Sequence, residues 1–412
     1  MNNMRIKEAL ESSNRWWKEE FKLEFKHREV YDEIKEFIDK RQIIALIGLR
    51  RVGKTTIMLK LIEESIREYG ARNIIYFSFD DFREIRLNEV LNAYSRLLNK
   101  ELKKERYLVL FDEIQKIEGW EEQIKRIYDD HNNIKLIISG SESLFIRKKS
   151  RESLAGRMFE FQIRTLSFKE YLDFRNKKFD NLNLYKEDIL KEFNQFILTN
   201  GFPELVNETK EFIEKYLKEN VIEKIIYKDI PQITSIRDVA VFDSILQIIM
   251  KDPGELINID EMAKEVGASR QTISIYLDYL EKAFLIKKLY NFSKNARKTQ
   301  RKAKKYYPCI ILPQTIYESE MFGKVFETFL VLQLNAEYFW RDAYKNEVDV
   351  VLIKKEIFPI EIKVSKIQEK PLKLFMKKFK LKKGLILTYE KEEKIIFDGK
   401  EISITPFYKY LL

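Results

Sequence analysis

The stretch GLRRVGKTT, from Gly48 to Thr56, has the residue types and spacing of a phosphate-binding loop. It matches the pattern G-x-x-x-x-G-K-[ST]. Glycines let backbone N–H groups approach phosphate oxygens, the lysine reaches the terminal phosphates, and the threonine hydroxyl can ligate magnesium. The expected nucleotide-binding residues are Gly48, Leu49, Arg50, Arg51, Val52, Gly53, Lys54, Thr55 and Thr56. A tight glycine turn without a ligand is the alternative.

The segments on either side provide the context that this pattern requires. Residues 43–47 are all apolar and predict a buried strand, and residues 55–68 carry apolar side chains at helical spacing. Arg50 and Arg51 lie between the two loop glycines, where the backbone usually contacts phosphate. Their side chains are therefore expected to point outward, toward a partner domain.

A second magnesium ligand and a residue that activates water are expected at Asp112 and Glu113, which follow an apolar strand at residues 107–111. Asp112 would hold magnesium through water, and Glu113 would polarise the water that attacks ATP. Two further strands are predicted at residues 73–79 and 134–141. Ser139 and Ser141 end the second of these, where they would either sense the terminal phosphate or simply cap the strand. The expected cofactors are ATP and Mg²⁺.

Another group of acids lies in the last third of the chain. Glu327 is embedded in an apolar helix, Asp349 is expected to begin a strand, and Glu361 and Lys363 share one face of the strand IEIKV. Two carboxylates brought together repel each other unless a proton or a hard cation compensates them. Asp349 and Glu361 are therefore predicted ligands of magnesium, with Glu327 as an outer ligand, and Lys363 would orient water or stabilise charge. The alternative is an ordinary surface pair between Glu361 and Lys363.

Between these regions, residues 239–289 have the pattern of two short helices joined by a turn at Gly267. The second helix would bury Ile273, Tyr276, Leu277 and Leu280 and present Ser269, Arg270, Gln271 and Ser274 outward. Such a helix can enter the major groove of DNA, and the basic stretch at residues 294–305 could lie along phosphates. Protein contacts or a role as a rigid lever are the alternatives. Residues 166–235 predict successive amphipathic helices, broken at NGFPE and IPQI.

Composition narrows the classes of function. The 412 residues carry a net charge of +10 with a pI of about 9.1, which favours a polyanionic partner. Cys309 is the single cysteine, and the only histidines are His27 and His131. An intramolecular disulfide and a four-cysteine zinc site are therefore excluded. Without a signal peptide or a long apolar run, a soluble, cytoplasmic protein with no membrane partner is expected.

Four segments together resemble one known family: GLRRVGKTT, LVLFDEIQ, LIISGSESLF and ESLAGRMFEFQIRTLSFKEYL. They are similar to AAA-type ATPases of archaea and bacteria, P-loop proteins of the ASCE class, in the branch whose C-terminal region has a nuclease-like fold. The resemblance implies an α/β fold with a P-loop ATPase core at 1–165 and a helical lid at 166–235. A winged helix-turn-helix at 236–308 and a PD-(D/E)xK restriction-endonuclease-like domain at 309–412 would follow.

The same resemblance implies that Arg157 is an arginine finger, which would act on a neighbouring subunit of a homo-oligomer. An intramolecular salt bridge is the alternative for this arginine. The function expected from the whole sequence is binding and hydrolysis of ATP, directed to DNA through the winged helix and the C-terminal domain, with a metal-dependent nuclease site. The alternative is a signalling ATPase whose nucleotide state controls a binding surface, with an inactive nuclease-like fold.

Overall fold

The computed structural model describes the chain except residues 1, 83, 141–153, 234–235, 237 and 319. Ser141 lies outside the described residues. The chain divides into two compact units, Met1–Leu166 and Ser167–Leu412. In the described part of the chain, no helix is both long and apolar enough to cross a membrane.

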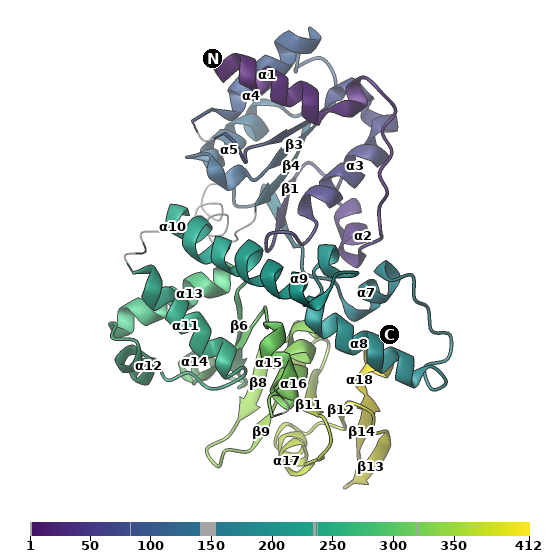
Figure 1. The fold of residues 1–412 in the computed structure, drawn as a ribbon, viewed down its shortest axis with the longest axis vertical. Coiled ribbons are helices and arrows are strands. Elements are labelled where there is room, and N and C mark those ends of the chain that lie inside the picture. Colours follow the sequence, from purple (N-terminus) through teal and green to yellow (C-terminus); the bar gives the residue numbers. More distant parts are fainter. Residues whose placement is uncertain (1, 83, 141–153, 234–235, 237, 319) are drawn as a thin grey trace. The chain divides into compact units, whose positions relative to one another are not determined.

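A five-stranded sheet forms the centre of the N-terminal unit (Figure 1). All its neighbouring strands are parallel, in the order β2-β3-β4-β1-β5. The strands are β1 (Ile43–Ile47), β2 (Ile74–Ser78), β3 (Tyr107–Asp112), β4 (Ile134–Gly140) and β5 (Met158–Gln162). The predicted α/β core is confirmed, and its sheet is parallel. Because β4 alone separates β1 from β3, the loop after β1 and the acids after β3 come to the same edge of the sheet.

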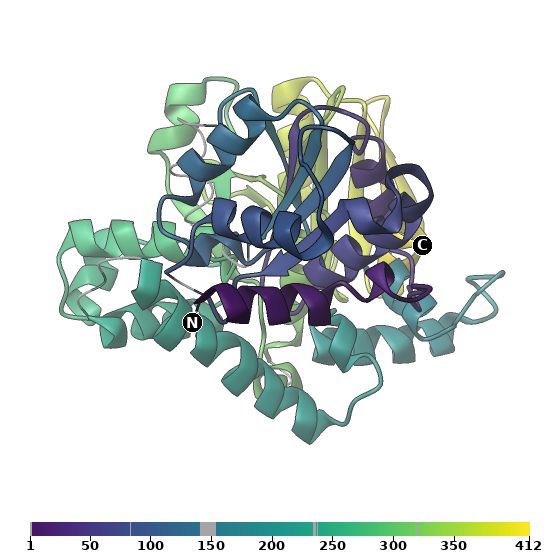
Figure 2. The same cartoon turned by 90° about the horizontal axis from the view of Figure 1, so that it is seen from above.

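Helices cover this sheet and protect its edge. α3 (Lys54–Tyr69) packs against β2, β3 and β4, while α1 (Asn2–Ser13) packs against β2 and α4 (Leu87–Leu98) (Figures 1 and 2). After α1, Asn14 forms two hydrogen bonds with the backbone of Tyr76, and the indoles of Trp16 and Trp17 donate to the carbonyl of Ile74. Polar groups on edge strand β2 are thereby satisfied within the chain. The remaining helices are α2 (Glu29–Lys35) and α5 (Trp120–Asp130).

In the C-terminal unit, the first helices share an aromatic core with the last. The helices concerned are α7 (Phe168–Phe174), α8 (Lys186–Thr199), α16 (Phe322–Gln333) and α18 (Phe407–Leu411). The ring of Phe193 in α8 lies 4.0 Å from that of Phe407 and 6.1 Å from that of Phe326, centroid to centroid. Part of the segment expected to form an ATPase lid is therefore packed on the C-terminal part of the chain.

A long helical segment follows, from α9 (Lys210–Lys215) through π-helical turns at Tyr216–Ile222 and Lys224–Asp229 to α10 (Ile230–Ile233). The prediction that IPQI breaks the helix is wrong, because Ile230–Ile233 is helical. Pro231 is the second residue of α10, which follows the π-helical turns without a break.

Three helices and a hairpin occupy the middle of this unit. The helices are α11 (Val239–Lys251), α12 (Ile259–Glu265) and α13 (Arg270–Lys282). Strands β6 (Ile286–Asn291) and β7 (Lys304–Pro308) pair antiparallel, with α14 (Ala296–Arg301) between them. β6 also pairs with β8 (Tyr338–Arg341), so the sheet β7-β6-β8-β9 continues across the boundary predicted at residue 308.

The last sheet has the order β10-β11-β12-β14-β13. Its strands are β10 (Val350–Ile353), β11 (Ile357–Lys363), β12 (Lys383–Thr388), β13 (Glu393–Phe397) and β14 (Lys400–Pro406), and α15 (Pro313–Tyr317) and α17 (Lys370–Phe379) are the remaining helices. Asp349 was expected to begin a strand, but it lies at a bend between β9 (Glu347–Val348) and β10. The bend arises because the chain changes partner there: β9 pairs with β8, and β10 pairs with β11.

Candidate functional site

The loop between β1 and α3 depends on glycine at both ends. A Cβ on Gly48 would lie 2.1 Å from the carbonyl oxygen of Ile163, far inside contact distance. Gly53 has a φ of 95°, a conformation that glycine adopts without steric cost. Arg51 is exposed and Arg50 is partly exposed, which is compatible with the outward direction expected for both.

Lys54 and Thr55 begin α3 directly after this loop. The ammonium of Lys54 is buried and donates to the carbonyls of Gly48 and Leu49, at 3.2 and 2.8 Å. Thr55 donates from Oγ1 to Asp112 Oδ2 at 2.7 Å, and Thr56 is exposed beside it. The structure therefore brings together the lysine, the hydroxyl and the acid that were predicted from separate parts of the sequence.

Asp112 ends β3, and neutral donors surround its carboxylate. Besides Thr55, the hydroxyls of Tyr76 and Ser139 donate to it; the Tyr76 distance is 2.8 Å. Burial, and then the charge of Asp112, raise the pKa of Tyr76 well above its usual value, so the phenol stays protonated and remains a donor. Tyr76 was not among the predicted site residues, although its hydroxyl in the apolar run NIIYFSF was an available signal.

Glu113 directly follows Asp112 and has a left-handed backbone, with a φ of 55°. Its N–H donates to Asp112 Oδ1 at 3.1 Å, and its own carboxylate accepts from the amide of Gln115 at 2.6 Å. This conformation is uncommon for a residue other than glycine or asparagine and occurs often at functional sites. Glu113 is thus fixed beside Asp112, as the prediction for a residue that activates water requires.

A buried arginine, which the sequence analysis also missed, supports the loop from outside. Arg28 donates to the carbonyl of Val52 at 2.9 Å and to that of Arg164 at 2.7 Å. It therefore joins the phosphate-binding loop to the segment that follows β5. These contacts span 24 and 136 positions, and no periodic pattern in the sequence indicates them.

Arg157 directly precedes β5, where its role as an arginine finger was expected. Its guanidinium forms a salt bridge with Asp129, with an Nε–Oδ1 distance of 3.0 Å and a second bond of 3.3 Å from Nη2. Both side chains are partly exposed. The intramolecular salt bridge considered as the alternative is therefore present in this structure.

The predicted C-terminal acids also come together. Lys363 lies 3.1 Å from Asp349 Oδ2 and 2.9 Å from Glu361 Oε1. Burial, and then the charge of Asp349, raise the pKa of Glu361 well above its usual value. The pKa of Lys363 is also raised, since the two carboxylates outweigh the opposing effect of burial. Glu361 Oε2 is buried and has no hydrogen-bond partner among the described residues.

Lys305 enlarges this cluster and corrects one prediction. It was expected to lie along phosphates as part of a basic surface stretch, but its side chain is only 6% exposed. Its ammonium lies 2.5 Å from Glu347 and 3.6 Å from Glu327, and Glu327 also accepts from the hydroxyl of Tyr307 at 2.7 Å. Neighbouring residues of β7 face opposite sides, and Lys305 lies on the side where its ammonium meets Glu327 and Glu347.

Glu327, Asp349 and Glu361 do not form a set of three metal ligands. Among the described residues, no three His, Cys, Asp or Glu side chains are arranged to hold a metal ion. Asp349 and Glu361 alone, completed by a carbonyl and waters, fit a hard cation, and the orphaned Oε2 of Glu361 is the atom that such a cation would satisfy.

Comparison with known proteins decides the family. Residues 40–172 match an AAA domain, residues 190–309 a domain of unknown function (DUF8612), and residues 322–410 another (DUF4143). The uncharacterized protein MJ1544 of Methanocaldococcus jannaschii is 31% identical over 409 residues, which cover 92% of this chain and 90% of that protein. This chain belongs to the MJ1544 family. Its N-terminal unit is therefore an AAA-type P-loop core.

Other relatives of this MJ1544-family protein are more distant. MJ1637 of the same organism is 27% identical, over 88% of this chain and 85% of its own length. An uncharacterized protein of Haemophilus influenzae is 27% identical, over 63% of this chain and 66% of its own length. Cdc6p from Pyrobaculum aerophilum (11% identity, 74% and 96% coverage, TM-score 0.31) and PCH-2 of C. elegans (13%, 67% of each, TM-score 0.25) are solved structures with only weak similarity.

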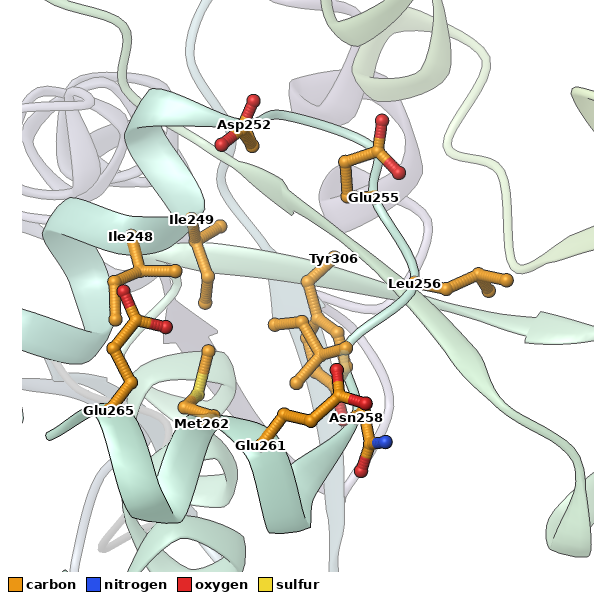
Figure 3. A pocket seen from close by; sticks show the side chains of 11 residues that line it. Ile248, Ile249, Asp252, Glu255, Leu256, Asn258, Glu261, Met262, Glu265 and Tyr306 are labelled. Atoms are coloured by element: carbon orange, nitrogen blue, oxygen red, sulfur yellow. The ribbon is translucent and has the colours of Figure 1, made fainter. Parts of the chain in front are cut away.

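The MJ1544-family protein also has an open pocket of about 380 Å³ beside α11 and α12 (Figure 3). Ile249, Met262 and Tyr306 line it with apolar surface, while Glu261 and Glu265 belong to its acidic lining. On α13 the inner face is buried as predicted, and the outer residues Ser269, Arg270, Gln271 and Ser274 are exposed. Arg270 forms a salt bridge of 3.2 Å with Asp260 of α12.

Proposed function

We propose that the N-terminal unit binds ATP with magnesium and hydrolyses it, and that the C-terminal unit directs this activity to DNA. The observation that carries the first part is the 2.7 Å hydrogen bond between Thr55 and Asp112, beside the buried ammonium of Lys54. Magnesium would offset the charge of the ATP phosphates. Thr55 and Asp112 would hold it, and Ser139 and Tyr76 fix the orientation of Asp112.

The other residues of this site have separate roles in the proposal. The loop from Gly48 to Gly53 presents backbone N–H groups to the phosphates, and Lys54 exchanges its two carbonyl partners for phosphate oxygens. Glu113 accepts the proton of the attacking water. Arg157 would leave Asp129 and reach the phosphates of a neighbouring subunit, which makes a homo-oligomer part of this proposal.

Replacing Lys54 tests nucleotide binding. Charged hydrogen bonds contribute about 1.5–3 kcal/mol each, so Lys54→Ala should weaken ATP binding on the order of 100-fold. Lys60→Ala, on the same helix but paired with Glu63, is the matched control. Fluorescent-nucleotide titration measures both, and equal affinities in Lys54→Ala and wild type would refute the proposed site.

The DNA-directed part of the proposal is tested by measuring ATP turnover with and without duplex DNA. Duplex DNA should stimulate turnover, and the stimulation should weaken as the salt concentration rises. If DNA neither binds nor stimulates turnover, the signalling ATPase is favoured instead.

A second candidate function is metal-dependent DNA cleavage by the C-terminal acids. The convergence of Asp349, Glu361 and Lys363, together with the buried, unpartnered Oε2 of Glu361, favours it. The cation would supply activation of water and charge for the scissile phosphate. Asp349 and Glu361 would hold it, Glu327 would support it from α16, and Lys363 would stabilise charge on the phosphate.

A nicking assay with magnesium or manganese on branched or partly single-stranded DNA tests this candidate. Cleavage should disappear in Asp349→Ala and Lys363→Ala but persist, at least in part, in Lys54→Ala. If Asp349→Ala cleaves DNA at the wild-type rate, the cleavage comes from a contaminating nuclease and the proposed site is wrong. The predicted order of core, helical lid, winged helix and nuclease-like domain, at 1–165, 166–235, 236–308 and 309–412, remains part of this proposal.

A further inference from the structure

Two basic segments of the C-terminal unit contain no acid. Residues 294–305, which include α14, have seven Lys and Arg residues and no Asp or Glu. Residues 370–383, which include α17, likewise have seven Lys residues and no acid. These segments are about 65 positions apart in the chain.

Aromatic side chains hold the two segments together. The rings of Phe292, before α14, and Phe379, in α17, lie 5.3 Å apart, and the Lys294 ammonium lies 5.8 Å from the Phe379 ring. The ammonium of Lys378 lies 5.2 Å from the Trp340 ring. Burial, and then the charge of Lys378, lower the pKa of Lys302. A lysine of the first segment is therefore close enough to be repelled by a lysine of the second. The fold therefore keeps like charges close together.

These cations form no ion pair within the described residues, but one carboxylate lies near them. Against the effect of burial, hydrogen bonds from Asn346 and Tyr344 and the charge of Lys378 lower the pKa of Asp342. No ion pair there involves any of Lys294, Arg297, Lys298, Arg301, Lys302 and Lys378, and all but Lys302 are exposed. On the same helix α17, by contrast, Lys373 pairs with Glu369 and Lys377 with Asp398, both at 2.7 Å. Repulsion among unpaired cations costs free energy, which a bound polyanion would offset.

The segment that contains α12 and α13 has the opposite charge. Residues 251–282, which include α12 and α13, contain seven acidic and four basic residues, and the pocket in Figure 3 has an acidic lining. Arg270, the one cation expected on the exposed face of α13 to contact DNA, is already paired with Asp260. The phosphates of a nucleic acid are therefore attracted to α14 and α17 more than to α13.

We propose that the surface formed by Lys294, Arg297, Lys298, Arg301, Lys302 and Lys378 binds the phosphodiester backbone of a nucleic acid, in place of α13. This inference rests on the proposed DNA-directed function and assigns it a surface. Trp340, beneath Lys378, pairs with Val348, the residue before Asp349.

The test uses the full chain and fluorescence anisotropy with a labelled DNA duplex and an RNA duplex of the same sequence, at several salt concentrations. The variant carries Arg297→Gln, Lys298→Gln and Arg301→Gln. The control carries Lys373→Gln, Lys377→Gln and Lys394→Gln, which removes the same charge from paired lysines. A third variant, Arg270→Gln with Gln271→Ala, probes α13.

The α14 variant should bind at least tenfold more weakly at about 0.1 M salt, with a log–log salt slope lower by roughly 0.9 for each phosphate that the variant no longer neutralises. The control and the α13 variant should stay within about twofold of wild type. The two duplexes distinguish DNA from RNA as the source of the phosphodiester backbone.

If the α14 variant binds like wild type while the α13 variant fails, this surface is wrong but the DNA-directed function stands. If wild type binds neither duplex, both fail. Binding to vesicles of anionic lipid with no binding to either duplex would also overturn the proposal. A midpoint temperature of thermal unfolding equal to that of wild type would show that each variant is folded.

Discussion

Asp112 in the N-terminal unit and Asp349 in the C-terminal unit are both buried acids next to a strand, but their carboxylates have different partners. Asp112 accepts from the neutral hydroxyls of Thr55, Tyr76 and Ser139. Asp349 accepts from the backbone N–H of Ile362 at 2.8 Å and, unlike Asp112, also from a charged group, the ammonium of Lys363. Neutral donors orient a carboxylate without cancelling its charge. The first site is thus prepared for a cation from solution, while the second already contains one that belongs to the chain.

Buried lysines show the same difference. Lys135 and Lys305 are both almost fully buried. Lys135 donates to the carbonyls of Phe37, Lys40 and Gln42, and burial lowers its pKa to about 8. Lys305 lies against the carboxylates of Glu327 and Glu347, which overcome the effect of burial and raise its pKa. At equal burial, carboxylate partners raise the pKa of a lysine, whereas with carbonyl partners burial lowers it.

The largest effect is expected at Lys305. Lys305→Met leaves the carboxylate of Glu327 without its cation, while Glu347 keeps only its pair with Arg341 at 3.1 Å. The free energy of unfolding should therefore fall by about 3–5 kcal/mol. Urea denaturation followed by tryptophan fluorescence measures this loss. Lys304→Met, whose ammonium donates only to carbonyls, is the neighbouring control and should cost far less. Equal losses in the two variants would show that the carboxylate pairing is unimportant.

A smaller loss, about 1–3 kcal/mol, is expected for Lys135→Met at neutral pH, because three buried carbonyls lose their donor. The pH dependence of the free energy of unfolding also distinguishes wild type from Lys135→Met. The unfolded lysine keeps its proton up to about 10.5, while the folded one releases it near 8. Between these values the unfolded chain binds more protons, so the wild type should gain stability as pH rises and Lys135→Met should not.

Urea denaturation of wild type, Lys135→Met and the exposed control Lys103→Met at pH 7, 9 and 10 gives the free energy of unfolding of each protein at each pH. Parallel pH profiles for wild type and Lys135→Met would contradict the account of this lysine.

The smallest effect concerns the cation of the second site. Lys363→Met removes the internal positive charge between Asp349 and Glu361, so the affinity for Mn²⁺ should rise by about tenfold, equivalent to about 1.4 kcal/mol. Calorimetric titration in an Asp112→Asn background separates this site from the nucleotide site. Lys366→Met, exposed and three residues along the chain, should leave the affinity unchanged. A lower affinity in Lys363→Met would mean that the lysine does not compete with a metal.

Local patterns in the sequence identified much of the fold and of both sites. Apolar runs located β1, β3 and β4, and alternation along IEIKV put Glu361 and Lys363 on one face. Contacts between distant segments were not predictable in this way. Tyr76 reaches Asp112 through the pairing of β2 with β3, and Lys305 of β7 is buried against Glu327 and Glu347, which lie more than 20 positions along the chain. The net charge of residues 294–305 therefore did not indicate that Lys305, a member of this basic stretch, is buried.

The proposed hydrolysis of ATP in the N-terminal unit, which is the central claim, is tested most directly by ATP turnover in Glu113→Gln. The variant keeps Lys54, Thr55 and Asp112, so ATP binding should match wild type while steady-state hydrolysis falls by about 100-fold or more. Glu118→Gln, exposed five residues along the chain, should hydrolyse ATP normally. Equal hydrolysis in Glu113→Gln and wild type, with both binding ATP, would contradict the proposed chemistry at this site.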